Sequence, residues 1–306
     1  MIAAARLHGT APVLHLSTLT ENGQFSTERA ETVLTDGAMQ AALLTQIADT
    51  VRVKGFAGVD VDFEYLPGYL SGAYAAFLER LRRILRPIGR FLWVALAPKT
   101  SANQRGLLYE GHDYAALDAA VDAALLMTYE WGYTAGPPMA VAPLPNVRAV
   151  LDYAVTELPA EKLLLGVPNY GYDWPLPFVQ GQTRAKSISN QQAIELALQY
   201  RIAIQYDQTA QSPTSGLRTP AAFPPSSALL PNTAFSAAVS GISCARFLRY
   251  GCLPTVCTTS FSIGFPFRIA LSPPRKADLS GHFSVFPLHF DKMNICCRAK
   301  FRCIFQ

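Results

Sequence analysis

The first 243 residues of this 306-residue chain contain no cysteine, and the last 94 contain no glutamate. All six cysteines, ten basic residues and only two of the 22 acidic residues lie after residue 212. The cysteine spacings do not repeat a zinc-binding pattern, and adjacent Cys296 and Cys297 form a poor chelate, so no metal site is predicted. The basic residues are scattered among Ser, Pro and Phe, so no nucleic-acid partner is expected.

Long apolar runs and nucleotide-binding glycine motifs are also missing. No stretch of 18 uncharged apolar residues occurs, so no membrane span is expected. Residues 1–6 lack the basic segment and apolar stretch of a secretory signal, which leaves a disulfide framework for the cysteines unsupported. No G-x-G-x-x-G or G-x-x-x-x-G-K-[ST] follows a predicted strand, and we expect no cofactor.

Residues 12–212 show apolar strands alternating with amphipathic helices. Strands are predicted at 12–17, 56–64, 91–97, 124–128 and 163–167, and helices at 37–52, 74–85, 114–121, 147–155 and 190–200. This alternation is typical of an α/β protein with a parallel sheet, either an open doubly wound sheet or a (β/α)8 barrel. Polar residues follow several strands, at Asp62, Lys99, Tyr129 and Asn169, and barrel enzymes carry their chemistry at that end.

Residues 58–64, GVDVDFE, hold three carboxylates at alternating positions. In a strand, Asp60, Asp62 and Glu64 share one face, and their mutual repulsion raises at least one pKa, as a general acid at neutral pH requires. A half-buried strand with a polar outer face is the alternative. A calcium or magnesium site is a weaker one, because the segment lacks the EF-hand pattern.

Three segments in order resemble glycoside hydrolase family 18, the chitinase-like retaining hydrolases. They are GVDVDFE at 58–64, MTYE at 127–130 and LGVPNYG at 165–171. The segments DFEY at 62–65, YEWGY at 129–133 and IQYD at 204–207 resemble its spore-germination branch. The resemblance implies an incomplete (β/α)8 TIM barrel in which strands 3–7 are recognisable, followed by an irregular C-terminal tail.

The resemblance also implies a set of site residues. Glu64 would be the general acid, Asp62 would orient the substrate's acetamido group, Asp60 would tune Asp62, and Tyr129 would donate a hydrogen bond to that group. The substrate-binding candidates are Met127, Glu130, Trp131, Asn169, Tyr170 and Trp174. Met127 could equally fill the core, and Trp131 and Trp174 could pack beneath loops. Trp93 and His15 are expected to be structural.

The expected domain organisation follows the same resemblance. Residues 1–213 would form the partial barrel, with 172–213 the start of an insertion between strands 7 and 8. Residues 214–306 would be a disordered or aberrant tail, from a shifted reading frame or unrelated sequence. Strands 1 and 2 of the family are not recognised, which suggests N-terminal truncation. No Trp follows Trp174, although the family's strand 8 normally carries one.

The implied activity is substrate-assisted, retaining hydrolysis of β-1,4-linked N-acetylglucosamine glycans in peptidoglycan, spore cortex or chitin. The alternatives are a non-catalytic carbohydrate-binding barrel and an inactive fragment. The expected partner is an N-acetylglucosamine-containing polysaccharide, with a place in the cell wall, the spore or the extracellular space. Which glycan is cleaved, whether cleavage is endo or exo, and the oligomeric state stay open.

Overall fold

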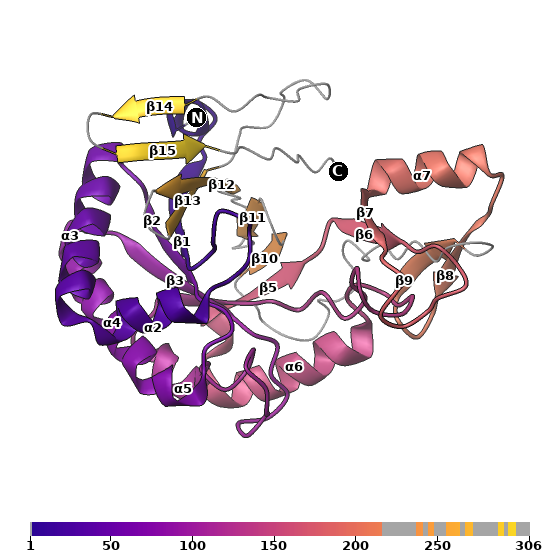
Figure 1. The fold of residues 1–306 in the computed structure, drawn as a ribbon, viewed down its shortest axis with the longest axis horizontal. Helices are drawn as coiled ribbons and strands as arrows, with labels where there is room; N and C mark the ends of the chain where they lie inside the picture. The colour runs from indigo at the N-terminus through magenta and orange to yellow at the C-terminus, as the bar shows by residue number, and fades with distance from the viewer. Residues whose placement is uncertain are drawn as a thin grey trace.

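The computed structural model describes residues 2–215 and, in the rest of the chain, only the backbone of short strands (Figure 1). These strands are β10 (Ala237–Ser240), β11 (Cys244–Phe247), β12 (Thr255–Ile263), β13 (Phe267–Leu271), β14 (Pro287–Phe290) and β15 (Met293–Cys297). The other residues of the predicted irregular tail, Cys252 and Cys303 among them, lie outside the described residues, and so does the proposed change of reading frame.

Five parallel strands in chain order form the centre of the fold: β1 (Ala11–Ser17), β2 (Gly58–Asp62), β3 (Phe91–Leu96), β4 (Ala123–Leu126) and β5 (Leu163–Val167). All five were predicted, and the α/β class is confirmed. Strand β2 is shorter than expected. It ends at Asp62 because the Phe63 carbonyl is bonded to the His112 imidazole, at 2.9 Å, and not to a neighbouring strand.

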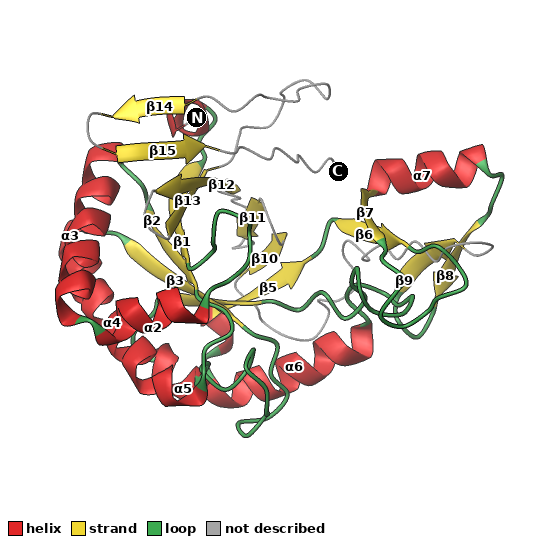
Figure 2. Cartoon of the chain, viewed as in Figure 1, coloured by secondary structure: helices red, strands yellow, loops and turns green. Residues whose placement is uncertain are grey.

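Helices cover the outer face of this sheet (Figure 2). They are α2 (Thr27–Thr35), α3 (Gly37–Lys54), α4 (Ser71–Leu85), α5 (Tyr114–Asp118) and α6 (Leu144–Glu157), with 3₁₀ turns at Gly68–Leu70, Arg86–Ile88 and Ala160–Lys162. The short helix α1 (Ile2–Leu7) precedes β1. The apolar residues of β2, Val59 and Val61, and Phe63 just after it are fully buried in the core that the helices form with the sheet. None of the helices in the described residues is long and apolar enough to span a bilayer.

The inner face of the sheet has an apolar lower layer. Val13, Trp93, Ala123 and Leu164, from four different strands, form one buried cluster there. Trp93 is 6% exposed and stacks on Phe91, with ring centroids 4.7 Å apart, so it is a core residue as expected. Since side chains alternate along a strand, the next inward positions on β1 and β2 lie one layer closer to the carboxyl ends. They are His15 and Asp60.

Backbone from the tail extends the sheet on both sides. Strand β10 pairs with β5, and β12 pairs with β1 at Ala11↔Val256 and Pro12↔Cys257. An irregular tail was expected, and its short strands β10 and β12 supply partners for the two edges of the five-stranded sheet. An edge strand has unpaired N–H and C=O groups that can form hydrogen bonds with another strand, and this accounts for the added pairings.

Residues after β5 form a separate group of elements to one side of the sheet (Figure 1). They comprise β6 (Tyr170–Asp173), β7 (Lys186–Ser189), α7 (Asn190–Gln199), β8 (Ile204–Asp207) and β9 (Ser212–Ser215). The β6–β7 and β8–β9 pairs are both antiparallel. A capping box at Ser189 and Gln192 begins α7. This group occupies the segment where we predict the insertion.

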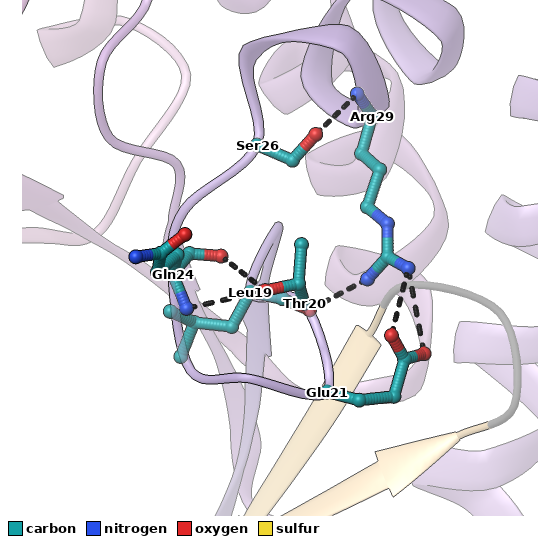
Figure 3. A network of polar contacts seen from close by, with 6 residues as sticks. All are labelled: Leu19, Thr20, Glu21, Gln24, Ser26 and Arg29. Atoms are coloured by element: carbon teal, nitrogen blue, oxygen red, sulfur yellow. Dashed lines mark hydrogen bonds and ion pairs between the residues drawn. The ribbon is translucent and has the colours of Figure 1, made fainter.

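The loop between β1 and α2 is tied together by Arg29 (Figure 3). Its guanidinium donates to the Leu19 carbonyl at 2.9 Å and to the Glu21 carboxylate at 3.3 Å. The Ser26 hydroxyl accepts from the Arg29 backbone N–H and caps α2. The loop therefore leaves the carboxyl end of β1 in a fixed direction and places the start of α2 beside the residues that follow β2.

Candidate active site

Three acids project from β2 and the residues after it. Asp60 is buried, at 8% exposure, and its Oδ2 lies 2.8 Å from Nδ1 of His15. Asp62 is half-buried, and its Oδ2 lies 3.6 Å from Nε2 of the same ring. Glu64 lies beyond the end of the strand and is also half-buried. The three carboxylates thus run from the interior toward the carboxyl ends of the strands, with Asp60 the deepest.

Burial and mutual repulsion change the protonation of two of these acids. Burial, opposed in part by His15 and assisted by Asp60, raises the pKa of Asp62 to about 6. Burial, assisted by the charges of Asp62 and Glu130, raises the pKa of Glu64 to about 8. At pH 7 most Glu64 side chains carry a proton and most Asp62 side chains do not. A proton donor therefore lies next to a carboxylate.

The backbone on both sides of Glu64 is anchored by polar side chains. On one side, buried His112 accepts from the Ala97 N–H through Nδ1, so its Nε2–H donates to the Phe63 carbonyl. On the other side, the Thr27 hydroxyl at the start of α2 donates to the Tyr65 carbonyl at 2.8 Å. Tyr65 has a left-handed backbone, with φ of 56°, which redirects the chain directly after the acid.

Tyr129, two residues after Met127, faces the acids. Its pKa is raised well above the usual value, first by burial and then by the charges of Asp62, Glu64, Asp60 and Glu130, all of which act on its hydroxyl. The ring lies against Gly166 of β5, where an added Cβ would lie 2.6 Å from Tyr129 Cε1 and 2.6 Å from the Leu126 carbonyl oxygen. Only glycine at position 166 leaves room for the ring in this place.

Glu130 is fixed by two tyrosines of β6. The Tyr172 hydroxyl lies 2.9 Å from both carboxylate oxygens, and the Tyr170 hydroxyl donates to Oε1. Burial and the Glu130 charge raise the pKa of both phenols, which keeps them as donors. Glu130 has φ of 68°, a conformation that non-glycine residues rarely adopt. Its carboxylate is therefore held in place by the segment that follows β5.

The comparison with protein families decides what this arrangement is. Residues 21–215 match the model of glycosyl hydrolases family 18. The chain belongs to this family. The resemblance seen in the sequence motifs is confirmed.

Individual relatives of this family member narrow the branch. A cortical fragment-lytic enzyme of Bacillus subtilis is 48% identical over 193 residues, which cover 63% of this chain and 45% of the relative. The crystal structure of the spore cortex-lytic enzyme SleL from Bacillus cereus superposes with a TM-score of 0.67 at 40% identity, covering 69% of this chain and 48% of that one. A chitinase from Chromobacterium violaceum superposes with a TM-score of 0.66 at 26% identity, covering 72% and 69%. The chain spans about half the length of the curated relatives that it matches.

The other predicted site residues of this family member differ in burial and in their contacts. Tyr170 is buried with its hydroxyl on Glu130, and Met127 is 8% exposed at the end of β4. Trp131 is half-buried against the main core, and Asn169 is half-buried just before β6. All four stay candidates for substrate contact.

Two expectations about residues at the carboxyl ends of the strands need correction. Trp174 is 1% exposed, packs with Tyr172 and donates its indole N–H to the Gly136 carbonyl at 2.8 Å, so it supports a loop and has no free face for a sugar. The Lys99 side chain is not exposed at the carboxyl ends of the strands. It is 3% exposed, and its ammonium donates to the His112 carbonyl at 2.8 Å, which makes it part of the support behind Glu64.

Three residues near the acids were missed by the sequence analysis, or given another role. His15 was expected to be structural, yet its ring lies between two predicted catalytic carboxylates. Tyr172 and His112 were not predicted at all. The alternation of His15 and Ser17 on one face of β1 was the available signal, but it points to Asp60 only once the register His15↔Asp60 is known. Within the described residues, no cluster of three or more His, Cys, Asp and Glu is placed to bind a metal.

Proposed function

We propose that this chain hydrolyses β-1,4-linked N-acetylglucosamine glycans of the peptidoglycan or spore-cortex type, by substrate-assisted retaining catalysis. The observation that carries the proposal is the row of Asp60, Asp62 and Glu64 at the carboxyl end of β2, where burial and neighbouring charges raise the pKa of Glu64 to about 8 and that of Asp62 to about 6. A general acid that keeps its proton at neutral pH next to an ionised partner is the acid–base pair that such a reaction needs.

Each predicted catalytic residue has one task in this mechanism. Glu64 protonates the glycosidic oxygen, the bond from that oxygen to the anomeric carbon breaks, and the rest of the glycan leaves as an alcohol. The carbonyl oxygen of the substrate's own 2-acetamido group attacks the anomeric carbon and forms an oxazolinium ion. Asp62 accepts the acetamido N–H and stabilises the positive charge that develops. Tyr129 donates to the acetamido oxygen, for which its raised pKa keeps the proton on the phenol. Glu64, now a carboxylate, activates the water that opens the intermediate.

The choice of cortex-type glycans is supported by the relatives. A cortical fragment-lytic enzyme and a spore cortex-lytic enzyme carry those names, and the identities to this chain are 48% and 40%. The chitinase is more distant, at 26% identity. Glu130 and the two β6 tyrosines would contact the sugar that precedes the cleaved bond, with Met127 below it and Trp131 and Asn169 at the rim.

The test compares the unmodified chain with Glu64→Gln on a fluorogenic N-acetylchitobiose and on purified cortex fragments. We expect turnover by the unmodified chain and a loss of about 100- to 10,000-fold in kcat for the variant, because glutamine cannot donate the proton. Binding of N-acetylglucosamine oligomers, followed by calorimetry, should be retained in the variant.

Each other outcome replaces the proposal with an alternative. If both proteins bind the oligomers equally and neither cleaves them, the chain is a carbohydrate-binding barrel. If neither binds nor cleaves, the chain is an inactive fragment. Glu79→Gln, at an exposed position of α4 where the carboxylate pairs with Arg83, is the matched control and should change nothing.

A further inference from the structure

The imidazole of His15 lies between the two inner acids. Strand β1 runs parallel to β2 with His15 opposite Asp60 and Ser17 opposite Asp62. One ring nitrogen is 2.8 Å from Asp60 Oδ2, and the other is 3.6 Å from Asp62 Oδ2. The side chains of His15, Asp60 and Asp62 are 18%, 11% and 15% exposed, so the three groups interact largely out of water.

The opposite oxygens of both acids have no donor among the residues that the structure describes. Asp60 Oδ1, Asp62 Oδ1 and the neighbouring Ser17 Oγ are buried and have no hydrogen-bond partner among the described residues. A buried acceptor without a donor costs about 1–3 kcal/mol, so these atoms require a donor from outside the described residues, such as a water molecule or a ligand. Asp62 is the less deeply placed of the two acids, so its Oδ1 lies nearer to the carboxyl ends of the strands, where the proposed substrate would bind.

We propose that His15 is a positioning residue for Asp62: its ring holds Oδ2 of Asp62 and Oδ2 of Asp60, and so leaves Oδ1 of Asp62 to accept the N–H of the substrate's acetamido group. This inference rests on the proposed function. It assigns to β1 a role in the reaction that the three family motifs, which lie on other segments, do not contain.

The charges around the ring explain why a histidine fits here. Asp60 and Asp62 from β2 face it, with Glu64 and the Tyr129 phenol next to them, and among these described groups His15 is the only one able to carry a positive charge. A neutral imidazole has one N–H, whereas the imidazolium has two: Nδ1 lies within hydrogen-bond distance of Asp60 Oδ2, and Nε2 lies at an ion-pair distance of 3.6 Å from Asp62 Oδ2. The charged ring also lowers the pKa of Asp62 against the burial that raises it.

Two amide variants separate the two ends of the ring. His15→Asn keeps a donor near the Nδ1 position and loses the one near Asp62, and His15→Gln keeps a donor near Nε2 and loses the one near Asp60. Both remove the charge. We expect the acid limb of the kcat/KM profile, near pH 6 in the unmodified chain, to move upward by about one pH unit, with kcat/KM about fivefold lower at pH 6. The alkaline limb, set by Glu64, should stay in place.

A purely structural His15 gives a different result. Loss of packing would lower kcat/KM equally at every pH and leave the acid limb unmoved, which would overturn the proposal. His8→Gln, at an exposed position before β1, is the matched control and should leave the profile unchanged. If neither variant folds, ¹⁵N chemical shifts of the unmodified chain decide, because both ring nitrogens of His15 must carry a proton at pH 6. A neutral ring there contradicts the proposal.

A readout without turnover separates this inference from the proposed function. In ¹³C-carboxyl NMR, the titration midpoint of Asp62 should move upward in His15→Gln relative to the unmodified chain. If it moves while no N-acetylated glycan is cleaved, the bridge is correct and the proposed function is wrong. If glycans are cleaved and the midpoint stays where it was, the bridge is wrong and the proposed function stands.

Discussion

The two layers of side chains on the inner face of the sheet have opposite chemical character. The lower layer, Val13, Trp93, Ala123 and Leu164, is apolar and almost fully buried. The upper layer, one alternation further along the strands, holds His15, Asp60 and Asp62, with Tyr129 beside them. It holds carboxylate oxygens that are buried and have no donor in the part of the chain that the structure describes. The lower layer stabilises the fold, whereas the upper layer lowers its stability and holds the groups of the proposed reaction.

The largest expected effect comes from Asp62→Asn, which should damage function and spare stability. We expect kcat to fall about 100- to 1000-fold, because the neutral amide cannot stabilise a developing positive charge. At pH 8 the variant should be at least as stable as the unmodified chain, since a buried carboxylate is removed. Kinetics on the fluorogenic substrate and urea unfolding at pH 8 test this. Asp49→Asn, on the exposed side of α3, is the control. A variant that is both inactive and destabilised would argue against the contrast.

Leu164→Ala should do the reverse in the lower layer. Leu164 is fully buried, so the cavity left by truncation should lower the free energy of unfolding by about 2–5 kcal/mol. Its kcat, measured well below the melting temperature, should change little because no acid is touched. Urea denaturation with parallel kinetics gives both numbers. Leu198→Ala, 73% exposed on α7, should leave both unchanged.

The stability of the fold should fall as pH rises from about 5 to 8. Folding raises the pKa of Asp62 to about 6 and of Glu64 to about 8, so across this range the folded chain binds more protons than the unfolded chain. The free energy of unfolding then decreases with rising pH. Melting temperatures at pH 5, 6.5 and 8 test the sign. Glu64→Gln should remove most of the decrease between pH 6.5 and 8. An equal slope in both proteins would contradict the raised pKa of Glu64.

A smaller effect is expected from Gly166→Ala, because Gly166 lies against the Tyr129 ring beside the upper layer. The new Cβ would lie 2.6 Å from the Tyr129 ring and 2.6 Å from the Leu126 carbonyl oxygen, so the ring must move. We expect a loss of about 1–3 kcal/mol in unfolding free energy and a fall in kcat/KM of several-fold. Gly72→Ala, in α4 with no atom near its added Cβ, is the control. A normal kcat/KM would mean that Tyr129 does not need its present position.

The pattern of apolar residues was enough to predict the sheet and the alternation of the acids. The five strands follow from runs bounded by Pro and Gly, and Asp60 and Asp62 share a face because strand geometry has a period of two. The two short helices α1 and α2 were missed. Helix α2 helps to anchor the backbone next to Glu64, because the Thr27 hydroxyl donates to the Tyr65 carbonyl. Nine residues with several charges give little periodic signal, and tertiary contacts decide such a helix.

Partners across strands were beyond what the sequence could predict. His15 and Asp60 are 45 residues apart and meet only because β1 and β2 pair in one particular register. The exposure of Trp174 likewise depended on how the loop that contains Gly136 folds over it. For both residues the chemical type was informative, but its surroundings were set by segments far away along the chain.

The His112 ring has one more consequence. Burial lowers its pKa to about 4, so it stays neutral from pH 5 to pH 9 while Asp62 and Glu64 gain and lose protons. The bond that fixes the Phe63 carbonyl is therefore indifferent to the acidity of the medium. A change of pH in this range can therefore change the charge of Glu64, while the hydrogen bond that positions the neighbouring backbone stays the same.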